Sequence, residues 1–490
     1  MELMPFSEQF EALASGKIDI STAQTTSTVE RDILISSILS GVTFSTPYVY
    51  GGASFFGIPE YVDCADRGDT LLGNCRNLAV CVAKATVWAD MVENILGGSV
   101  TYEVSFNSEL LPRLLDGTCN VITSSPLTIH EQLAEQSGDT AEQVSQYVLA
   151  PRSFARDPLT LTTRNDDVEF SDMVNWIVRA LVVAETMDIT QDTAHLFPTT
   201  DLFGEDYVDM FQNAIAAGGN YAELYKQSLQ DVFPRGAKGI NTPHLNAEDG
   251  GLLYPIPLGE IDKEITSQVG PVPGGTLEII GQREKFNCGI LEGRPGLAEW
   301  NETANDWMGI DVDFCRGIAA ALFAGDYETE LELVPFQSVE DGFLALFEKE
   351  VDALAGAVYN MVNDIREPTT EQGFAFGDIY YYQQDGSDVK TLAMATREDD
   401  VQWTDFVRSL VTSTIHAEAF DINQATAVDM PLFELLGSVY LQAFRDVILA
   451  VGSYAEIYER NMETHIPRIS NTRNTLNGGE TPMFFANWKF

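Results

Sequence analysis

Short apolar segments alternate along the chain with segments whose apolar residues recur every three or four positions. The first kind predicts buried strands and the second predicts amphipathic helices. Regular alternation of the two favours parallel α/β layers, in which helices cover the faces of a sheet. The elements expected in the first third of the chain are helices at Ser7–Ser15, Trp88–Leu96 and Ser108–Leu115, and strands at Ile18–Ile20, Leu78–Val82, Val100–Val104 and Cys119–Thr123.

One longer helix is expected at Ser171–Met187, because its apolar residues lie on a single helical face. These residues are Met173, Trp176, Ile177, Ala180 and Leu181. A second helix in similar surroundings is expected at Thr404–His416. The run Gly270-Pro-Val-Pro-Gly-Gly275 is typical of a linker. We therefore predict a linker at 261–280 that separates a first domain, 1–260, from a second, 281–490.

The chain contains two related copies of one sequence. Four motifs recur in the same order: Met1–Phe6 as Leu331–Phe336, Phe10–Asp19 as Phe343–Asp352, Thr163–Val168 as Thr396–Val401, and Gly219–Tyr225 as Gly452–Tyr458. Arg31 and Arg366, which we take as equivalent, are 335 residues apart, whereas Tyr221 and Tyr454 are 233 apart. The second copy therefore lacks about 102 residues in its middle, and the first copy has no counterpart of 281–330.

The composition is strongly acidic, with a formal charge of −46 and a pI of about 4.2. This argues against nucleic-acid or anionic-membrane binding, which need a basic surface. It favours solubility in salty surroundings, and a surface for a cationic partner is the alternative. No run of 18 apolar residues predicts a membrane-spanning helix. No signal peptide opens the chain, and we expect that the natural N-terminus is missing or wrongly assigned.

Six cysteines occur, none in a C-x-x-C motif or in a His/Cys cluster with zinc spacing. Three disulfides are possible, with 15 connectivities. We predict Cys64–Cys75, Cys81–Cys119 and Cys288–Cys315, since each is local and lies within one copy. Six buried thiols are the alternative. If the disulfides form, the protein works in an oxidising compartment.

Several ordered motifs resemble the extracellular (periplasmic) solute-binding proteins of family 3. They are Phe286-Asn-Cys-Gly-Ile290, Gly293-Arg-Pro-Gly296, Trp307–Ala320, Thr28-Val-Glu-Arg-Asp32, Phe44-Ser-Thr-Pro-Tyr48, Gly219–Glu223 and Gly250–Tyr254. The likeness is greatest to the general L-amino-acid-binding branch of ABC importers, which has two cysteines at the positions of Cys288 and Cys315.

The resemblance implies an α/β fold with type II periplasmic-binding-protein lobes, here in two incomplete tandem copies. It implies an extracytoplasmic protein that closes on a small polar or anionic solute and delivers it to an ABC permease. Arg31 matches the arginine that holds the ligand's carboxylate, which a guanidinium can bind bidentately. Thr26, Thr28 and Thr86 match positions that supply hydroxyl groups.

Both copies depart from the family pattern. The anion loop of the second lobe is Ala85-Thr86-Val87 where the family has Gly-Thr-Thr, and Ser125 stands where an aspartate binds the ligand's ammonium. Because a serine cannot neutralise a buried ammonium, we expect altered specificity. In the second copy Arg366 is kept, but Asn363 and Met361 stand at the positions of Thr28 and Thr26. Leu297 replaces the aromatic residue that stacks on the ligand.

Three functions remain open from the sequence. The first is solute capture, and the second is a scaffold or interaction role at a cell surface without ligand binding. An enzyme is the third and rests only on analogy of fold, since no common nucleotide, protease or hydrolase motif occurs; we expect no cofactor and no metal. Residues 281–330 could also pack on 1–50 in a swapped arrangement, or the chain could be a fragment of a longer array.

Overall fold

The chain folds into two compact units in a computed structural model. Unit 1 comprises 1–27, 47–161 and 225–234, and unit 2 comprises 28–46, 162–224 and 235–490. The first copy therefore contributes to both units, whereas the second copy lies in unit 2. The residues that the structure describes are 4, 8–84, 86–97, 100–104, 106–150, 157–231, 235, 241, 243–244, 252, 258–259, 270–324, 327–386, 388–476 and 484–485.

Unit 1 is built on a five-stranded sheet in the order β6-β5-β7-β4-β8. The first three strands are parallel, and the last two run antiparallel to their neighbours. Adjacent residues along a strand face opposite sides. Thus Val80 packs in one core and Cys81 in the other. The strands are β4 (Ser54–Gly57), β5 (Ala79–Ala83), β6 (Val100–Val104), β7 (Val121–Ser124) and β8 (Val148–Leu149).

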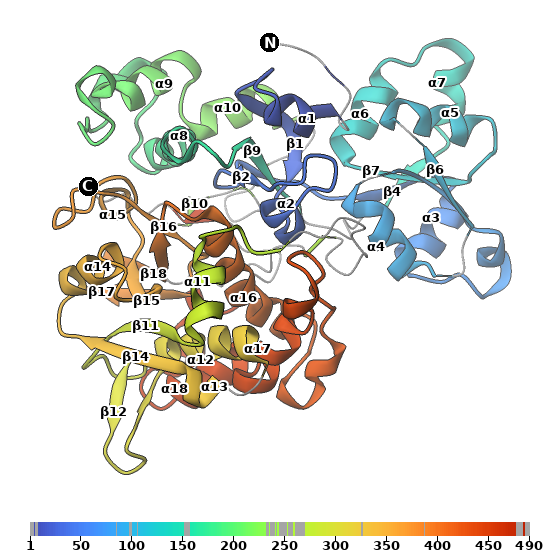
Figure 1. The fold of residues 1–490 in the computed structure, drawn as a ribbon. Coiled ribbons are helices and arrows are strands. Elements are labelled where there is room, and N and C mark those ends of the chain that lie inside the picture. Colours follow the sequence, from blue (N-terminus) through green and yellow to red (C-terminus); the bar gives the residue numbers. More distant parts are fainter. Residues whose placement is uncertain are drawn as a thin grey trace. The chain divides into compact units, whose positions relative to one another are not determined.

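Helices cover both faces of this sheet. The helices α3 (Pro59–Asp66) and α4 (Val87–Ile95) lie on one side, and α5 (Leu110–Leu115), α6 (Pro126–Ala134) and α7 (Gly138–Val144) lie on the other (Figure 1). Unit 1 also contains α1 (Gln9–Ala14), β1 (Ile20–Thr26) and β3 (Val49–Tyr50). The predicted α/β layers are confirmed.

All three predicted disulfides are present. Cys64–Cys75 links α3 to the short turn after it, and Cys81–Cys119 links β5 to the residues before β7. Cys288–Cys315 joins the first strand of the second copy to the helix that covers it. Each bond closes a local loop and restricts the unfolded chain, and together they indicate an oxidising environment.

The second copy forms a six-stranded sheet in unit 2, with the order β14-β11-β15-β18-β16 and with β17 paired to β18. The three strands β14, β11 and β15 are parallel. Ala353 and Ala355 of β15 pack in the larger core, whereas Leu354 and Ala357 pack in the smaller one. The strands are β11 (Phe286–Leu291), β14 (Leu331–Phe336), β15 (Ala353–Val358), β16 (Phe374–Phe376), β17 (Tyr381–Asp385) and β18 (Asp388–Arg397).

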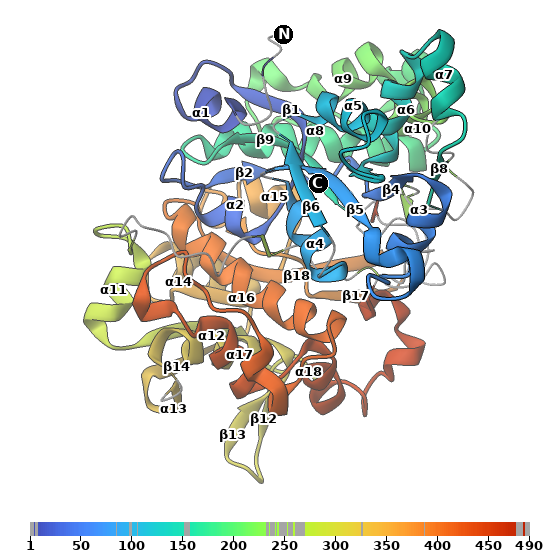
Figure 2. The ribbon, with the colours of Figure 1, turned by 90° about the vertical axis from the view of Figure 1, so that its right-hand side faces the viewer.

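Helices enclose this sheet as well, and the β12–β13 hairpin projects from it (Figure 2). The larger core lies under α12 and α16–α18, and the smaller core under α14. The elements are α11 (Thr276–Arg283), β12 (Glu299–Asn301), β13 (Asp306–Met308), α12 (Ile310–Phe323), α13 (Tyr327–Glu330), α14 (Val339–Phe347), α15 (Met361–Ile365), α16 (Val401–Ala419), α17 (Ala443–Val451), α18 (Tyr454–Asn461), and the pair β10 (Pro243–His244) and β19 (Phe484–Phe485).

Part of the first copy also belongs to unit 2. Its α8 supplies Trp176, Val183 and Ala184 to a third core, and β2 pairs with the end of β9. The elements are α2 (Val29–Ile33), β2 (Val42–Phe44), α8 (Val168–Thr186), α9 (Met210–Gly218), the end of β9 (Pro158–Arg164) and the start of α10 (Tyr221–Ser228).

Most sequence expectations for these elements hold, and three need correction. The helices expected at Ser171–Met187 and Thr404–His416 are α8 and α16. The strand expected at Ile18–Ile20 instead runs from Ile20 to Thr26. The helix α11 begins inside the predicted linker. The swapped arrangement is wrong, because β11 pairs with β14 and β15 of its own copy.

Candidate functional site

Arg31 lies on a short capped helix. Thr28 is the N-cap of α2, and its hydroxyl oxygen accepts a hydrogen bond from the backbone N–H of Arg31 at 3.2 Å. Such a cap satisfies a donor that the first helical turn leaves open. Arg31 is 8% exposed and Thr28 is fully buried. The turn therefore holds Arg31 in a nearly buried position, and arginine is the residue whose planar guanidinium matches a carboxylate bidentately.

A segment from the end of the first copy covers the start of α2. The backbone N–H of Glu30 donates to the carbonyl of Leu258 at 3.0 Å. Gly259 lies so close that a Cβ there would be 3.1 Å from the Thr28 hydroxyl and 2.7 Å from the Cβ of Glu30. The backbone donor at Glu30 is thus engaged. The guanidinium of Arg31 is the group at this turn with the chemistry to hold a carboxylate.

Thr26 lies at the end of β1, in unit 1, where it is 6% exposed. Its neighbour Thr25 donates to the side chain of Gln9 at 2.8 Å, and Thr160 donates to the carbonyl of Thr25 at 3.0 Å. Thr26 is therefore part of a polar strand that hydrogen bonds hold in a buried position, whereas Arg31 and Thr28 belong to unit 2.

Thr86 and Ser125 lie at one edge of the unit 1 sheet. Thr86 follows β5 and precedes α4, and its hydroxyl donates to Ala83 at 2.7 Å. Ser125 follows β7 and caps α6, where it accepts from the N–H of Thr128 at 3.1 Å. Because β5 and β7 are adjacent and parallel, their carboxyl ends meet at the same edge, where α/β proteins place ligands. The change at Ala85 lies outside the described residues.

One buried acid in unit 1 was absent from the predicted site. Asp157 is 1% exposed and accepts a hydrogen bond from the indole N–H of Trp88. Trp88 lies in the first turn of α4, the helix that follows Thr86. The sequence gave no sign of this contact, because 69 residues separate the pair. Asp157 is the carboxylate next to the helix that Thr86 begins.

The predicted equivalence of Arg31 and Arg366 is wrong by three residues. Asn360 caps α15 by accepting from the N–H of Asn363 at 2.9 Å, as Thr28 caps α2 through Arg31. The bridges Ile35–Ser40 and Glu367–Gln372 follow the two helices at the same distance. Asn363 therefore occupies the position of Arg31. Exposed Arg366 ends the helix.

The predicted equivalence followed the similarity of the two sequences rather than the pattern of buried residues. Arg31-Asp32 resembles Arg366-Glu367, yet the buried apolar residues fix the helix register. Val29 in α2 and Met361 in α15 are both buried after their caps. With this register the second copy has an asparagine, Asn363, at the position of Arg31, and its cap is also an asparagine.

The two copies contact each other reciprocally within unit 2. Asp32 of the first copy forms an ion pair with Arg408 of the second at 3.0 Å. The equivalent Asp364 of the second copy accepts from the indole N–H of Trp176 of the first at 2.6 Å. The same two kinds of element thus meet twice, α2 with α16 and α15 with α8. An isologous pair of subunits has this arrangement, here inside one chain.

Buried carboxyl groups gather at both of these contacts. Burial raises the pKa of Asp32 to about 7, although Arg408 opposes the shift. Burial likewise raises the pKa of Asp364 to about 7, against the Trp176 N–H and Arg179. Burial and nearby Asp364 raise the pKa of Glu398 to about 8. The contacts therefore favour protonated acids near neutral pH.

We expect the Asp364→Asn variant to be the more stable protein at pH 8. The folded pKa of Asp364 is raised from 3.8 to about 7, so its contribution to stability is present below 3.8 and is lost as the pH rises through 7. Asparagine keeps an acceptor for Trp176 but does not ionise. Its advantage should grow between pH 4 and 7, to a few kcal/mol, in urea unfolding of both proteins. An advantage equal at pH 4 and pH 8 would contradict the shift.

No helix in the described part of the chain is both long and apolar enough to cross a bilayer. Among the described residues, no group of three or more His, Cys, Asp or Glu side chains is arranged to hold a metal ion.

No family model matches the chain. The chain is similar to the general L-amino acid-binding periplasmic protein AapJ of Rhizobium johnstonii, at 24% identity over 276 residues that span 51% of this chain and 74% of that protein. It is also similar to YhdW of Escherichia coli K12, a putative amino-acid ABC transporter-binding protein, at 24% identity over 272 residues, which are 51% of this chain and 74% of that protein.

A third relative is the glutamate/glutamine/aspartate/asparagine-binding protein BztA of Rhodobacter capsulatus, at 23% identity over 272 residues, 51% of this chain and 75% of that protein. Among solved structures, the chain is similar to an ABC-transporter periplasmic binding protein from Brucella ovis with glutathione bound. The TM-score is 0.42 at 23% identity, and the match covers 52% of this chain and 82% of that one.

Proposed function

We propose that this chain, whose homologues are amino-acid-binding periplasmic proteins of ABC transporters, captures a small carboxylate solute outside the cytoplasm through its first copy. The observation that carries the proposal is Arg31, an arginine residue 8% exposed on a capped turn. A guanidinium binds a carboxylate bidentately, with two charge-assisted hydrogen bonds. Thr28, in the same unit as Arg31, is the proposed hydroxyl contact, and an ABC permease is the proposed recipient.

Two residues of unit 1 bear on the ligand class of the first copy. Ser125 caps α6 with its hydroxyl and carries no charge to offset an ammonium. Asp157 already accepts from the Trp88 indole. These features support a ligand whose main charge is the carboxylate, such as a short organic acid, over a free α-amino acid.

The second copy serves as a structural partner of the first in this proposal. Asn363 replaces the guanidinium with an amide, which cannot form a charged bidentate pair with a carboxylate. Meanwhile Val29, Ile33 and Leu34 of the first copy pack in the core of the second. This packing supports a role for the second copy in holding α2, the helix that carries Arg31.

We expect Arg31→Ala to abolish the melting-temperature shift that short organic acids produce in the intact chain. A ligand at 100 times its dissociation constant adds about 2.7 kcal/mol. Loss of the two charge-assisted bonds of a bidentate pair should weaken binding about 100-fold, which lowers the added stability to about 0.4 kcal/mol and so removes most of that shift.

Arg366→Ala is the matched control, because Arg366 is exposed and is not the equivalent of Arg31. It should leave the shift unchanged. A shift that survives Arg31→Ala but is lost in Arg366→Ala would overturn the assignment. No shift with any acid or amino acid would favour the alternative function, a cell-surface scaffold, which the engaged N–H of Glu30 and the lost arginine of the second copy support.

A further inference from the structure

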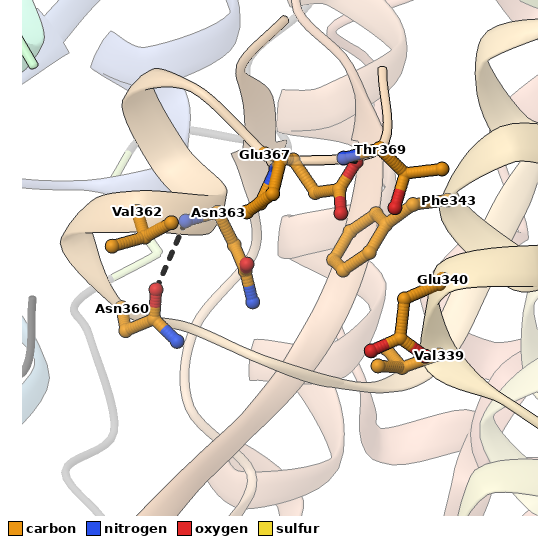
Figure 3. A pocket seen from close by; sticks show the side chains of 9 residues that line it. Val339, Glu340, Phe343, Asn360, Val362, Asn363, Glu367 and Thr369 are labelled. Carbon is orange, nitrogen blue, oxygen red and sulfur yellow. Dashed lines mark hydrogen bonds between the residues drawn. The ribbon is translucent and has the colours of Figure 1, made fainter. Parts of the chain in front are cut away.

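The second copy contains a pocket of about 250 Å³ between the start of α14 and the end of α15 (Figure 3). This is slightly smaller than the roughly 300–1,000 Å³ of common ligand sites, so it suits one short organic group. In Figure 3, Asn360 and Asn363 face Phe343 and Glu340 across the pocket. The lining residues are Val339, Glu340, Phe343, Asn360, Val362, Asn363, Glu367, Pro368 and Thr369.

The charge of this lining has one sign. Glu340 and Glu367 supply two carboxylates, and none of the nine lining residues is basic. Glu367 is 3% exposed, and its Oε2 accepts from the N–H groups of Thr369 at 3.0 Å and Thr370 at 2.9 Å. These bonds fix the carboxylate at the wall of the pocket and leave the acceptor capacity of Oε1 for a further donor.

The two amides add acceptors. Asn363 donates through Nδ2 to the carbonyl of Val358 at 2.8 Å, so its oxygen is the end available to a ligand. Phe343 is 1% exposed and presents an aromatic ring to the pocket (Figure 3). Carboxylates, an amide oxygen and a ring face are the groups that attract an ammonium or guanidinium ion.

The first copy has opposite chemistry at the equivalent corner. With the register given by the caps and bridges, Arg31 stands where Asn363 stands, and Ile35 stands where Glu367 stands. Between the copies, a buried cation has been lost and a buried acid gained. The equivalent helix and the turn after it thus carry a positive side chain in the first copy and a negative side chain in the second.

We infer that the second copy binds a small organic cation in this pocket, a primary ammonium or guanidinium on a short alkyl chain. The charged end lies between Glu340, Glu367 and the amide oxygen of Asn363, and the alkyl chain lies on Phe343. The site is independent of Arg31 and of the proposed carboxylate ligand.

The test is a titration of the full chain with butylammonium chloride, followed by saturation-transfer NMR in 0.3 M salt, which screens long-range attraction to the acidic surface. Saturable binding should weaken several-fold in Glu340→Gln and at least 10-fold in Asn363→Arg, which restores the cation of the first copy. Glu350→Gln is the matched control, since Glu350 is exposed and does not line the pocket. Glu340 is also exposed, so its substitution should not disturb folding.

Equal weakening by Glu340→Gln and Glu350→Gln would mean general attraction to the net charge and would overturn the inference. So would the absence of saturable binding, or unchanged binding in Asn363→Arg. Arg31→Ala should leave butylammonium binding intact, which separates failure of this site from failure of the carboxylate site.

Discussion

Arg408→Ala should destabilise unit 2 by about 3–5 kcal/mol, the usual cost of removing one partner of a buried ion pair. Arg408 lies between buried Asp32 of the first copy, at 3.0 Å, and partly buried Asp378 of the second, at 2.9 Å. Asp378 also accepts from Thr412 at 2.5 Å. Without the guanidinium, Asp32, which is 4% exposed, would lose its ion-pair partner at the contact between copies.

The loss should be larger at pH 8 than at pH 5. Burial raises the pKa of Asp32 and Arg408 lowers it, so removal of Arg408 raises this pKa further. At low pH Asp32 is then protonated and is no longer a buried, unpaired charge. Urea unfolding at both pH values measures this. Lys349→Ala is the control, because its pair with Asp399 is more than half exposed and should contribute at most about 1 kcal/mol. Equal losses in the two variants would contradict a buried contact between copies.

Trp176→Ala should lower the free energy of unfolding by about 3–5 kcal/mol, as replacement of other buried tryptophans by alanine does. Trp176 is 1% exposed and packs with Ala180, Phe197 and Phe211. Its indole also donates to Asp364 across the contact between copies. The substitution therefore leaves a cavity in the first copy and removes a donor from a buried acid of the second.

Two further variants separate these causes. Trp176→Phe keeps most of the ring volume and loses the N–H, so it should cost about 1–2 kcal/mol. Trp300→Ala changes a tryptophan that is 47% exposed on the β12–β13 hairpin and should have a small effect. If Trp176→Ala and Trp300→Ala unfold at the same urea concentration, the core around α8 does not stabilise the chain as described.

These two contacts pair segments of both copies within unit 2. The helix α2 of the first copy packs in the core of the second copy, and α15 packs on α8 in return. A reciprocal pairing of this kind buries apolar faces of both copies.

Much of the fold could be predicted from the sequence, because its signals are local. The apolar periodicity gave α8 and α16 within a few residues, and short spacing gave the disulfide Cys64–Cys75. The strand β1 was placed too early, because residues such as Thr25 are polar and are buried only through hydrogen bonds to distant partners such as Gln9.

The contacts that organise the candidate site could not be predicted. Asp32 and Arg408 lie in different copies, and the equivalent Asp364 meets a tryptophan, Trp176, instead of an arginine. No local pattern encodes such a pair. The caps of the two helices show that Asn363 occupies the position of Arg31. The sequence alone suggests Arg366 instead, because an alignment shifted by three residues still places one arginine opposite another.

The stoichiometry of carboxylate binding tests the central proposal most directly. Isothermal titration of the intact chain with the acid that gives the largest melting shift should show one site per chain. That site should be lost in Arg31→Ala and kept in Arg366→Ala, because the first copy alone carries the buried guanidinium on a capped turn. Two carboxylate sites per chain, or one site that survives Arg31→Ala, would contradict the division of roles between the two copies.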